Sequence, residues 1–138
     1  MTNRTKPVQP QNLLQPLLVL CLLLVITLAL YWQAREFPFF YLDDDAYIIK
    51  NTNIQNGLTL ESLRRAFLKP YAGFWIPLTW LSYMVDFELS GLDPSGFHLT
   101  NILLHGAKII LLVTLLYKMT GYGWRSLLVA ALFALHPL

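Results

Sequence analysis

The sequence predicts an all-α integral membrane protein. Of its 138 residues, 56% are hydrophobic and only 13% are charged, whereas soluble domains carry about 25% charged residues. The apolar residues form long blocks, and the mean hydropathy is +0.50. The net charge of +2 is too small to indicate nucleic acid as a partner. Cys21, the one cysteine, lies in an apolar run and predicts neither a disulfide framework nor a metal cluster.

The first predicted span covers residues 13–34, after a polar lead-in at 1–12. Its central residues, 17–30, contain no charge, and about 20 helical residues match the thickness of a bilayer core. A cleaved signal peptide is the alternative. We favour an uncleaved anchor because the apolar run is long and no small-residue cleavage site precedes Arg35.

Residues 35–96 form the predicted first loop, which contains all the acidic side chains of the sequence. Basic residues before the first span and in a later short loop predict a cytoplasmic N-terminus and place the acidic loop outside, in periplasm or lumen. We expect a multi-pass membrane protein. Within the loop, Thr59 is a helix N-cap candidate and Pro77 a first helical residue. Both predicted helices are expected to be amphipathic and to lie in the membrane plane.

The second predicted span, residues 97–119, has a polar stripe along one face. The stripe follows helical spacing and consists of His98, Asn101, His105 and Lys108. Ionisable residues inside a membrane are candidates for function, although a hydrogen-bonded seam between helices would use the same residues. A cytoplasmic turn is predicted at 120–125. A third span begins at 126–138, and its length predicts that it continues in a longer chain.

Three consecutive carboxylates, Asp43, Asp44 and Asp45, follow the first span closely. Like charges held together are unfavourable unless a cation, a substrate or water offsets them. This acidic segment is therefore the main candidate for a functional site. The three aspartates also form a candidate site for a divalent cation, although the sequence offers no firm metal ligand set.

A series of short motifs occurs in one order along nearly the whole chain after the first span. They include Leu42-Asp43-Asp44-Asp45-Ala46-Tyr47-Ile48, Gly57-Leu58-Thr59, Trp75-Ile76-Pro77-Leu78-Thr79-Trp80, Gly91-Leu92-Asp93-Pro94, Phe97-His98-Leu99-Thr100-Asn101 and Ala131-Leu132-Phe133-Ala134-Leu135-His136-Pro137. In these motifs the chain resembles the N-terminal part of the GT-C membrane glycosyltransferases with C-terminal tetratricopeptide repeats, the group of the transmembrane-and-TPR O-mannosyltransferases and their bacterial relatives.

The resemblance implies a GT-C-type polytopic helix bundle of which this chain is the N-terminal part. It also implies that an acidic pair in the first outward loop is catalytic. The family pattern, Asp-acidic-x-x-Tyr, fits Asp43 and Asp44 followed by Tyr47, and a shift by one residue to Asp44 and Asp45 stays open. The sequence departs from the family at Phe97, where a second histidine is usual. The further spans and the repeats would lie beyond Leu138.

The implied reaction transfers a sugar, plausibly mannose, from a polyprenyl-phosphate donor to a protein hydroxyl. A carboxylate would serve as general base, which contributes roughly 10²–10⁴ in rate. Hydrogen-bond donors near the lipid phosphate would stabilise the leaving group. The candidates for binding donor phosphate or substrate are His98, Asn101, Lys108 and Trp75. The expected partners are the bilayer, the donor and the acceptor, with a divalent cation as an optional cofactor.

Two alternatives stay open at this point. The chain is a non-enzymatic membrane assembly or scaffold protein whose aspartates bind a cation or a partner, or it is an inactive truncated fragment, because three partial spans cannot enclose a donor lipid. Of the 138 residues alone we expect no activity.

Overall fold

The computed structural model describes residues 14–136, and these are mostly helical, with no β-strand among them. The lead-in at 1–12, the first residue of the first predicted span (Leu13) and the last two residues of the third predicted span lie outside this range. The chain divides into two compact units. Unit 1 comprises residues 1–27 and 106–138, and unit 2 comprises residues 28–105.

Within residues 14–136, two helical stretches are long and apolar enough to cross a membrane. One is the 23-residue stretch Leu14–Glu36, which consists of α1 (Leu14–Tyr31) and the 3₁₀ turn η1 (Trp32–Glu36). The other is the 27-residue helix α5 (Pro94–Thr120). Only 11% and 17% of their apolar windows are buried, whereas a core helix of a soluble protein would be mostly buried. These helices therefore support a location in the membrane.

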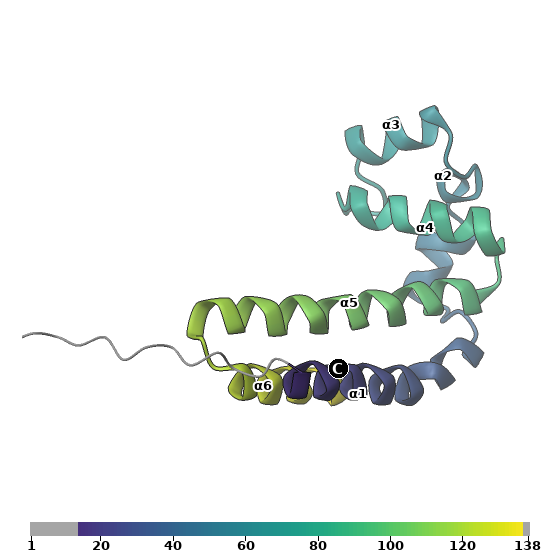
Figure 1. Ribbon diagram of the computed structural model, residues 1–138. Coiled ribbons are helices and arrows are strands. Elements are labelled where there is room, and N and C mark those ends of the chain that lie inside the picture. Colours follow the sequence, from purple (N-terminus) through teal and green to yellow (C-terminus); the bar gives the residue numbers. More distant parts are fainter. Residues whose placement is uncertain (1–13, 137–138) are drawn as a thin grey trace, which may run out of the picture. The chain divides into compact units, whose positions relative to one another are not determined.

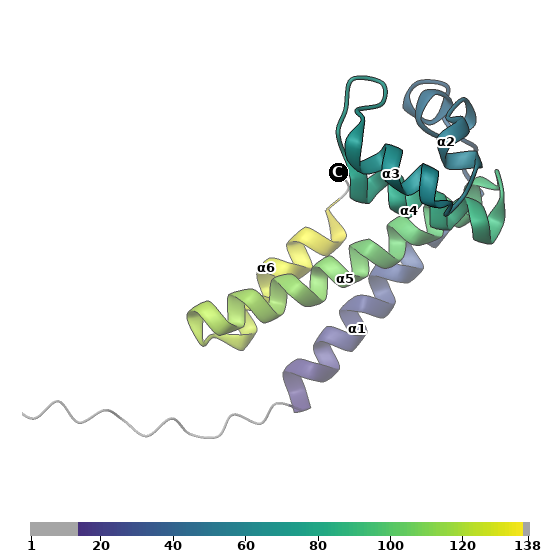
Figure 2. The same ribbon diagram turned by 90° about the horizontal axis from the view of Figure 1, so that it is seen from above.

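In unit 1, the parts of α1 and α5 that belong to it pack with α6 (Gly123–Leu135), which runs back along α5 after a short turn (Figures 1 and 2). Gly121 makes that turn with a φ of 73°, a value that favours glycine, and its N–H donates to the Tyr117 carbonyl at 2.8 Å. The core centres on Ile109 and on the small side chains of Ala130 and Ala134, all fully buried.

Unit 2 contains the expected loop and builds it from short helices. They are the π-helical turn η2 (Asp45–Ile49), α2 (Thr52–Gln55), α3 (Leu60–Leu68) and α4 (Pro77–Ser90), followed by the first part of α5. The core of the unit consists of Ile54, Ala66, Trp80 and Met84. Each of α2, α3 and α4 contributes to it, so the three helices form one packed group (Figures 1 and 2).

Local sequence signals explain where α3 and α4 begin. The Thr59 hydroxyl accepts a hydrogen bond from the Ser62 N–H at 3.1 Å and lies 2.8 Å from the Ser62 hydroxyl. Pro77 is the first residue of α4, where its missing N–H costs nothing. Both helices occur where the sequence predicts them. Their orientation in a membrane stays a prediction.

Replacing Thr59 with alanine should destabilise the first turn of α3. Losing an N-cap of this kind costs about 1 kcal/mol, and Ser62, whose side chain is buried, loses a partner as well. Amide hydrogen exchange at Ser62 should become about fivefold faster or more. Thr52→Ala is the control, because the exposed Thr52 side chain makes no hydrogen bond in the described part of the chain. Unchanged exchange at Ser62 would show that the cap contributes nothing.

Candidate active site

The three aspartates of the acidic segment have three different environments. The Asp44 carboxylate accepts a hydrogen bond from the Phe40 N–H at 2.8 Å, which closes a turn before η2. The Asp45 carboxylate pairs with the Lys50 ammonium, and this pair raises the pKa of Lys50. Asp43 is exposed and makes no hydrogen bond or ion pair in the described part of the chain. Of the three carboxylates, that of Asp43 is therefore accessible to solvent and has no partner among the described residues.

Tyr83 of α4 lies in the electrostatic field of this segment. Burial raises the pKa of the Tyr83 phenol, and the negative charges of Asp44, Asp86 and Asp43 raise it further. Its ring makes edge-on contacts with Trp80 and with Phe97. Since the phenol stays protonated at neutral pH, Tyr83 offers a hydrogen-bond donor close to the acidic segment.

Asp86, also on α4, is a buried carboxylate that sequence reasoning did not select. Its side chain is 3% exposed and accepts a hydrogen bond from the Thr100 hydroxyl of α5. Burial raises its pKa, and the Thr100 hydrogen bond opposes this by stabilising the charged form. The available signal was an acid inside a mostly apolar helical run. The Asp86 carboxylate is expensive to bury. Its hydrogen bond with Thr100 holds α4 against the first part of α5.

The residues expected to bind the donor have different surroundings in the structure. The His98 Nε2 lies 3.1 Å from the Phe37 carbonyl oxygen, at the start of the extended segment that leads to the aspartates. Trp75 is exposed, and its indole N–H donates to the Phe67 carbonyl at 2.9 Å. Asn101 is an exposed residue of α5 in unit 2, and Lys108 is an exposed residue of α5 in unit 1. Of these four residues, His98 is the one that is hydrogen-bonded to the segment leading to the aspartates.

His105, the remaining residue of the predicted stripe, makes an edge-on ring contact with Tyr31 of α1, with 5.2 Å between the ring centres. Within residues 14–136, no group of three His, Cys, Asp or Glu side chains is arranged to hold a metal ion. The three aspartates do not form such a group, since Asp44 and Asp45 are turned toward Phe40 and Lys50.

Sequence comparison relates the chain to curated proteins. It is 33% identical over 125 residues to the protein O-mannosyl-transferase TMTC4 of Mus musculus, covering 71% of this chain and 16% of that protein. It is 31% identical over 124 residues to Tmtc2 of Drosophila melanogaster, covering 82% of this chain and 13% of that protein. The protein O-mannosyl-transferase tmtc2 of Xenopus laevis is 40% identical over 62 residues, which cover 45% of this chain and 7% of that protein.

The chain thus spans less than a fifth of the length of these relatives. No family model matches it, and no solved structure does. The identities nevertheless establish a relationship to the TMTC proteins, which are named as transferases.

Replacing Asp86 with asparagine should change how stability depends on pH. The folded pKa of Asp86 lies above its usual value, so the folded state binds the proton more tightly than the unfolded state does. The folded state therefore loses stability as the pH rises from the unfolded pKa through the folded pKa. Asparagine still accepts from Thr100 and cannot ionise. The thermal midpoint of Asp86→Asn relative to the unsubstituted chain should therefore rise as the pH rises above the usual pKa of an aspartate, about 4.

Asp93→Asn is the matched control with the opposite sign. Hydrogen bonds from the Ser95 N–H and hydroxyl hold the pKa of Asp93 below its usual value. This carboxylate stabilises the folded state at pH values above its unfolded pKa. That contribution is lost as the pH falls through the folded pKa. The relative midpoint of Asp93→Asn should fall as pH rises. Identical pH profiles for the unsubstituted chain and Asp86→Asn would rule out a destabilising buried charge.

Proposed function

We propose that this chain, a relative of the TMTC protein O-mannosyl-transferases, is the catalytic N-terminal portion of a GT-C-type glycosyltransferase. It would transfer mannose from a polyprenyl-phosphate donor to a protein hydroxyl. The observation that carries the proposal is the identity of 31–33% along 71–82% of the chain with proteins named for this activity. The remaining spans and the tetratricopeptide repeats would follow Leu138.

The proposed topology puts the reaction on the outer face of the membrane. Arg4 and Lys6 before α1, and Lys118 and Arg125 around the α5–α6 turn, would be cytoplasmic. The acidic segment would then lie in periplasm or lumen, and we assign the protein to the bacterial inner membrane as a multi-pass protein. The expected partners are the lipid-linked donor and an acceptor protein.

We assign the role of general base to Asp43. A base must reach the acceptor hydroxyl within hydrogen-bond distance, and the Asp43 carboxylate is exposed and free of competing bonds in the described part of the chain. Asp44 would orient the segment, since its carboxylate is held by the Phe40 N–H. Asp45 is already neutralised by Lys50. This division of roles supports the pair Asp43 and Asp44 over the shifted pair Asp44 and Asp45.

The leaving group would be a lipid phosphate, which needs hydrogen-bond donors as charge develops. His98 is the candidate bonded to the chain that precedes the aspartates. Asn101, Lys108 and Trp75 stay in the proposal as contacts to the donor. A divalent cation near the aspartates stays an optional part of it.

The proposal is tested with Asp43→Asn in the full-length protein. Without a general base, mannose transfer to an acceptor peptide should fall by roughly 10²-fold or more, while membrane insertion and expression stay unchanged. The readout is transfer of radiolabelled mannose from a polyprenyl-phosphate donor in membranes.

Asp45→Asn is the control at a neighbouring position of the same segment. It should retain most activity, because it removes only the ion pair with the exposed Lys50 side chain, and ion pairs at the surface contribute little stability. Full transfer by Asp43→Asn would exclude Asp43 as the base. Loss of transfer in Asp44→Asn and Asp45→Asn, with Asp43→Asn active, would establish the shifted register instead.

A further inference from the structure

A series of aromatic rings connects the two ends of the acidic segment, and Tyr83 is its middle member. The successive rings make edge-on contacts with 5.3 to 6.1 Å between ring centres, and they run Phe39, Phe97, Tyr83, Trp80, Tyr47. The first of these residues precedes the three aspartates by four positions, and the last follows them by two. The Tyr83 ring is therefore linked, through one ring on each side, to both stretches of chain that flank the acidic segment.

The Tyr83 hydroxyl has no partner in the described part of the chain. The side chain is only partly buried. Buried polar side-chain atoms without a partner do occur among the described residues, in Arg35, Asn53 and Trp80, and the Tyr83 oxygen is not one of them. This oxygen thus keeps a surface that an atom of another molecule can reach.

The surrounding charges define which kind of group the hydroxyl can bind. Burial and the negative charges of Asp44, Asp86 and Asp43 raise the pKa of the Tyr83 phenol, so at neutral pH the hydroxyl is a hydrogen-bond donor. The same carboxylates disfavour a further anion close by. A neutral oxygen, such as a hydroxyl or a carbonyl, therefore suits this position better than a phosphate does.

We propose that the Tyr83 hydroxyl donates a hydrogen bond to a neutral oxygen of a substrate and holds that substrate beside the acidic segment. The assignment rests on the proposed function, because it takes the lipid-linked sugar and the acceptor protein as the substrates. Both offer the required chemistry, since a sugar has hydroxyl oxygens and a peptide has backbone carbonyls. Tyr83 thereby binds a substrate, while Asp43 takes the proton.

The test is Tyr83→Phe in the full-length protein, which removes the hydroxyl and keeps the ring. Dissociation constants are measured in nanodiscs by equilibrium binding, separately for polyprenyl-phosphate mannose and for a threonine-containing peptide. A neutral hydrogen bond contributes a factor of about 2 to 10 in affinity, so at least one of the two constants should rise by that factor. The thermal midpoint should stay the same, because the hydroxyl has no partner in the described part of the chain.

The two probes distinguish the substrates. A rise for polyprenyl-phosphate mannose alone identifies a sugar hydroxyl, a rise for the peptide alone identifies a peptide oxygen, and a rise for both identifies the shared chemistry. All three results support the proposal. Unchanged constants would overturn it. A lower thermal midpoint of Tyr83→Phe would also overturn it, by showing that the hydroxyl is bonded within the fold.

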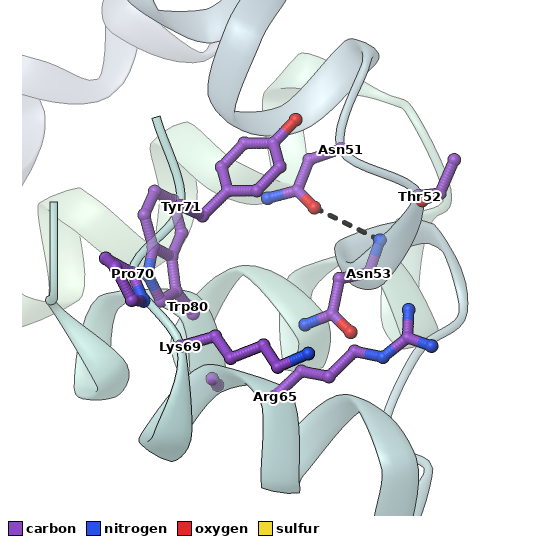
Figure 3. A pocket seen from close by; sticks show the side chains of 9 residues that line it. Asn51, Thr52, Asn53, Arg65, Lys69, Pro70, Tyr71 and Trp80 are labelled. Atoms are coloured by element: carbon purple, nitrogen blue, oxygen red, sulfur yellow. Dashed lines mark hydrogen bonds between the residues drawn. The ribbon is translucent and has the colours of Figure 1, made fainter. Parts of the chain in front are cut away.

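Tyr71→Phe is the matched control. Tyr71 also makes an edge-on contact with Trp80, with 5.8 Å between ring centres, and its hydroxyl has no partner in the described part of the chain. It lines a pocket, shown in Figure 3 with Asn51 and Lys69, that none of the aspartates lines. Both dissociation constants should therefore stay unchanged. An equal loss of affinity in Tyr71→Phe and Tyr83→Phe would reject the assignment in favour of a general effect on aromatic packing.

Failure of the proposed function would give a different result. If the unsubstituted protein bound neither probe, the proposed substrates would be wrong, and the assignment of Tyr83 would be overturned with them. If the unsubstituted protein bound the probes and Tyr83→Phe bound them equally well, only the assignment of Tyr83 would be overturned.

Discussion

The burial of Trp80 is the constraint on which the rest of unit 2 depends. The helices α2, α3 and α4 have 4, 9 and 14 residues, and helices this short are marginal in isolation. The Trp80 ring makes edge-on contacts with Tyr47, Tyr71 and Tyr83, at centre distances of 5.5, 5.8 and 6.1 Å. Burying an aromatic side chain of about 150–250 Å² stabilises by about 4–6 kcal/mol. This one side chain therefore joins segments that would otherwise not persist.

Trp80 also supports the acidic segment. Tyr47 follows the aspartates by two residues, so its contact with Trp80 fixes where η2 begins and where the carboxylates leave the packed unit. Trp80 also lines a pocket of about 220 Å³ in the same unit. The acidic segment is thereby supported by aromatic packing, while its charges stay at the surface. A carboxylate that must accept a proton from an incoming hydroxyl needs such a rigid support and an open face.

The sequence predicts the elements of this structure better than the roles of its side chains. The cap at Thr59, the start at Pro77 and the apolar stretches are local signals, and the structure contains the corresponding helices. Burial depends on which neighbour a helix meets, and the pattern of one helix does not contain that. Trp75 and Trp80 look alike in sequence, yet Trp75 is 62% exposed and Trp80 is 2% exposed. Asp86 was missed for the same reason.

Each unit is stabilised internally by a different force. In unit 2 the packed aromatic core removes apolar surface from water, which is the usual driving force. Unit 1 instead leaves large apolar side chains exposed, among them Leu18 at 60%, Val25 at 63% and Leu132 at 67%. A bilayer offers these side chains an equally apolar solvent, so their burial would contribute no stability there. What remains is close contact between helices, and small residues allow it.

Ala130 and Ala134, both fully buried, fill this role in α6. Gly106 of α5 is less restricted, because a Cβ there would meet Leu24 of α1 at 4.0 Å, an ordinary contact distance, so alanine would also fit. Ala130 and Ala134 therefore matter to the fold of unit 1 for the space they leave, and Trp80 matters to unit 2 for the space it fills.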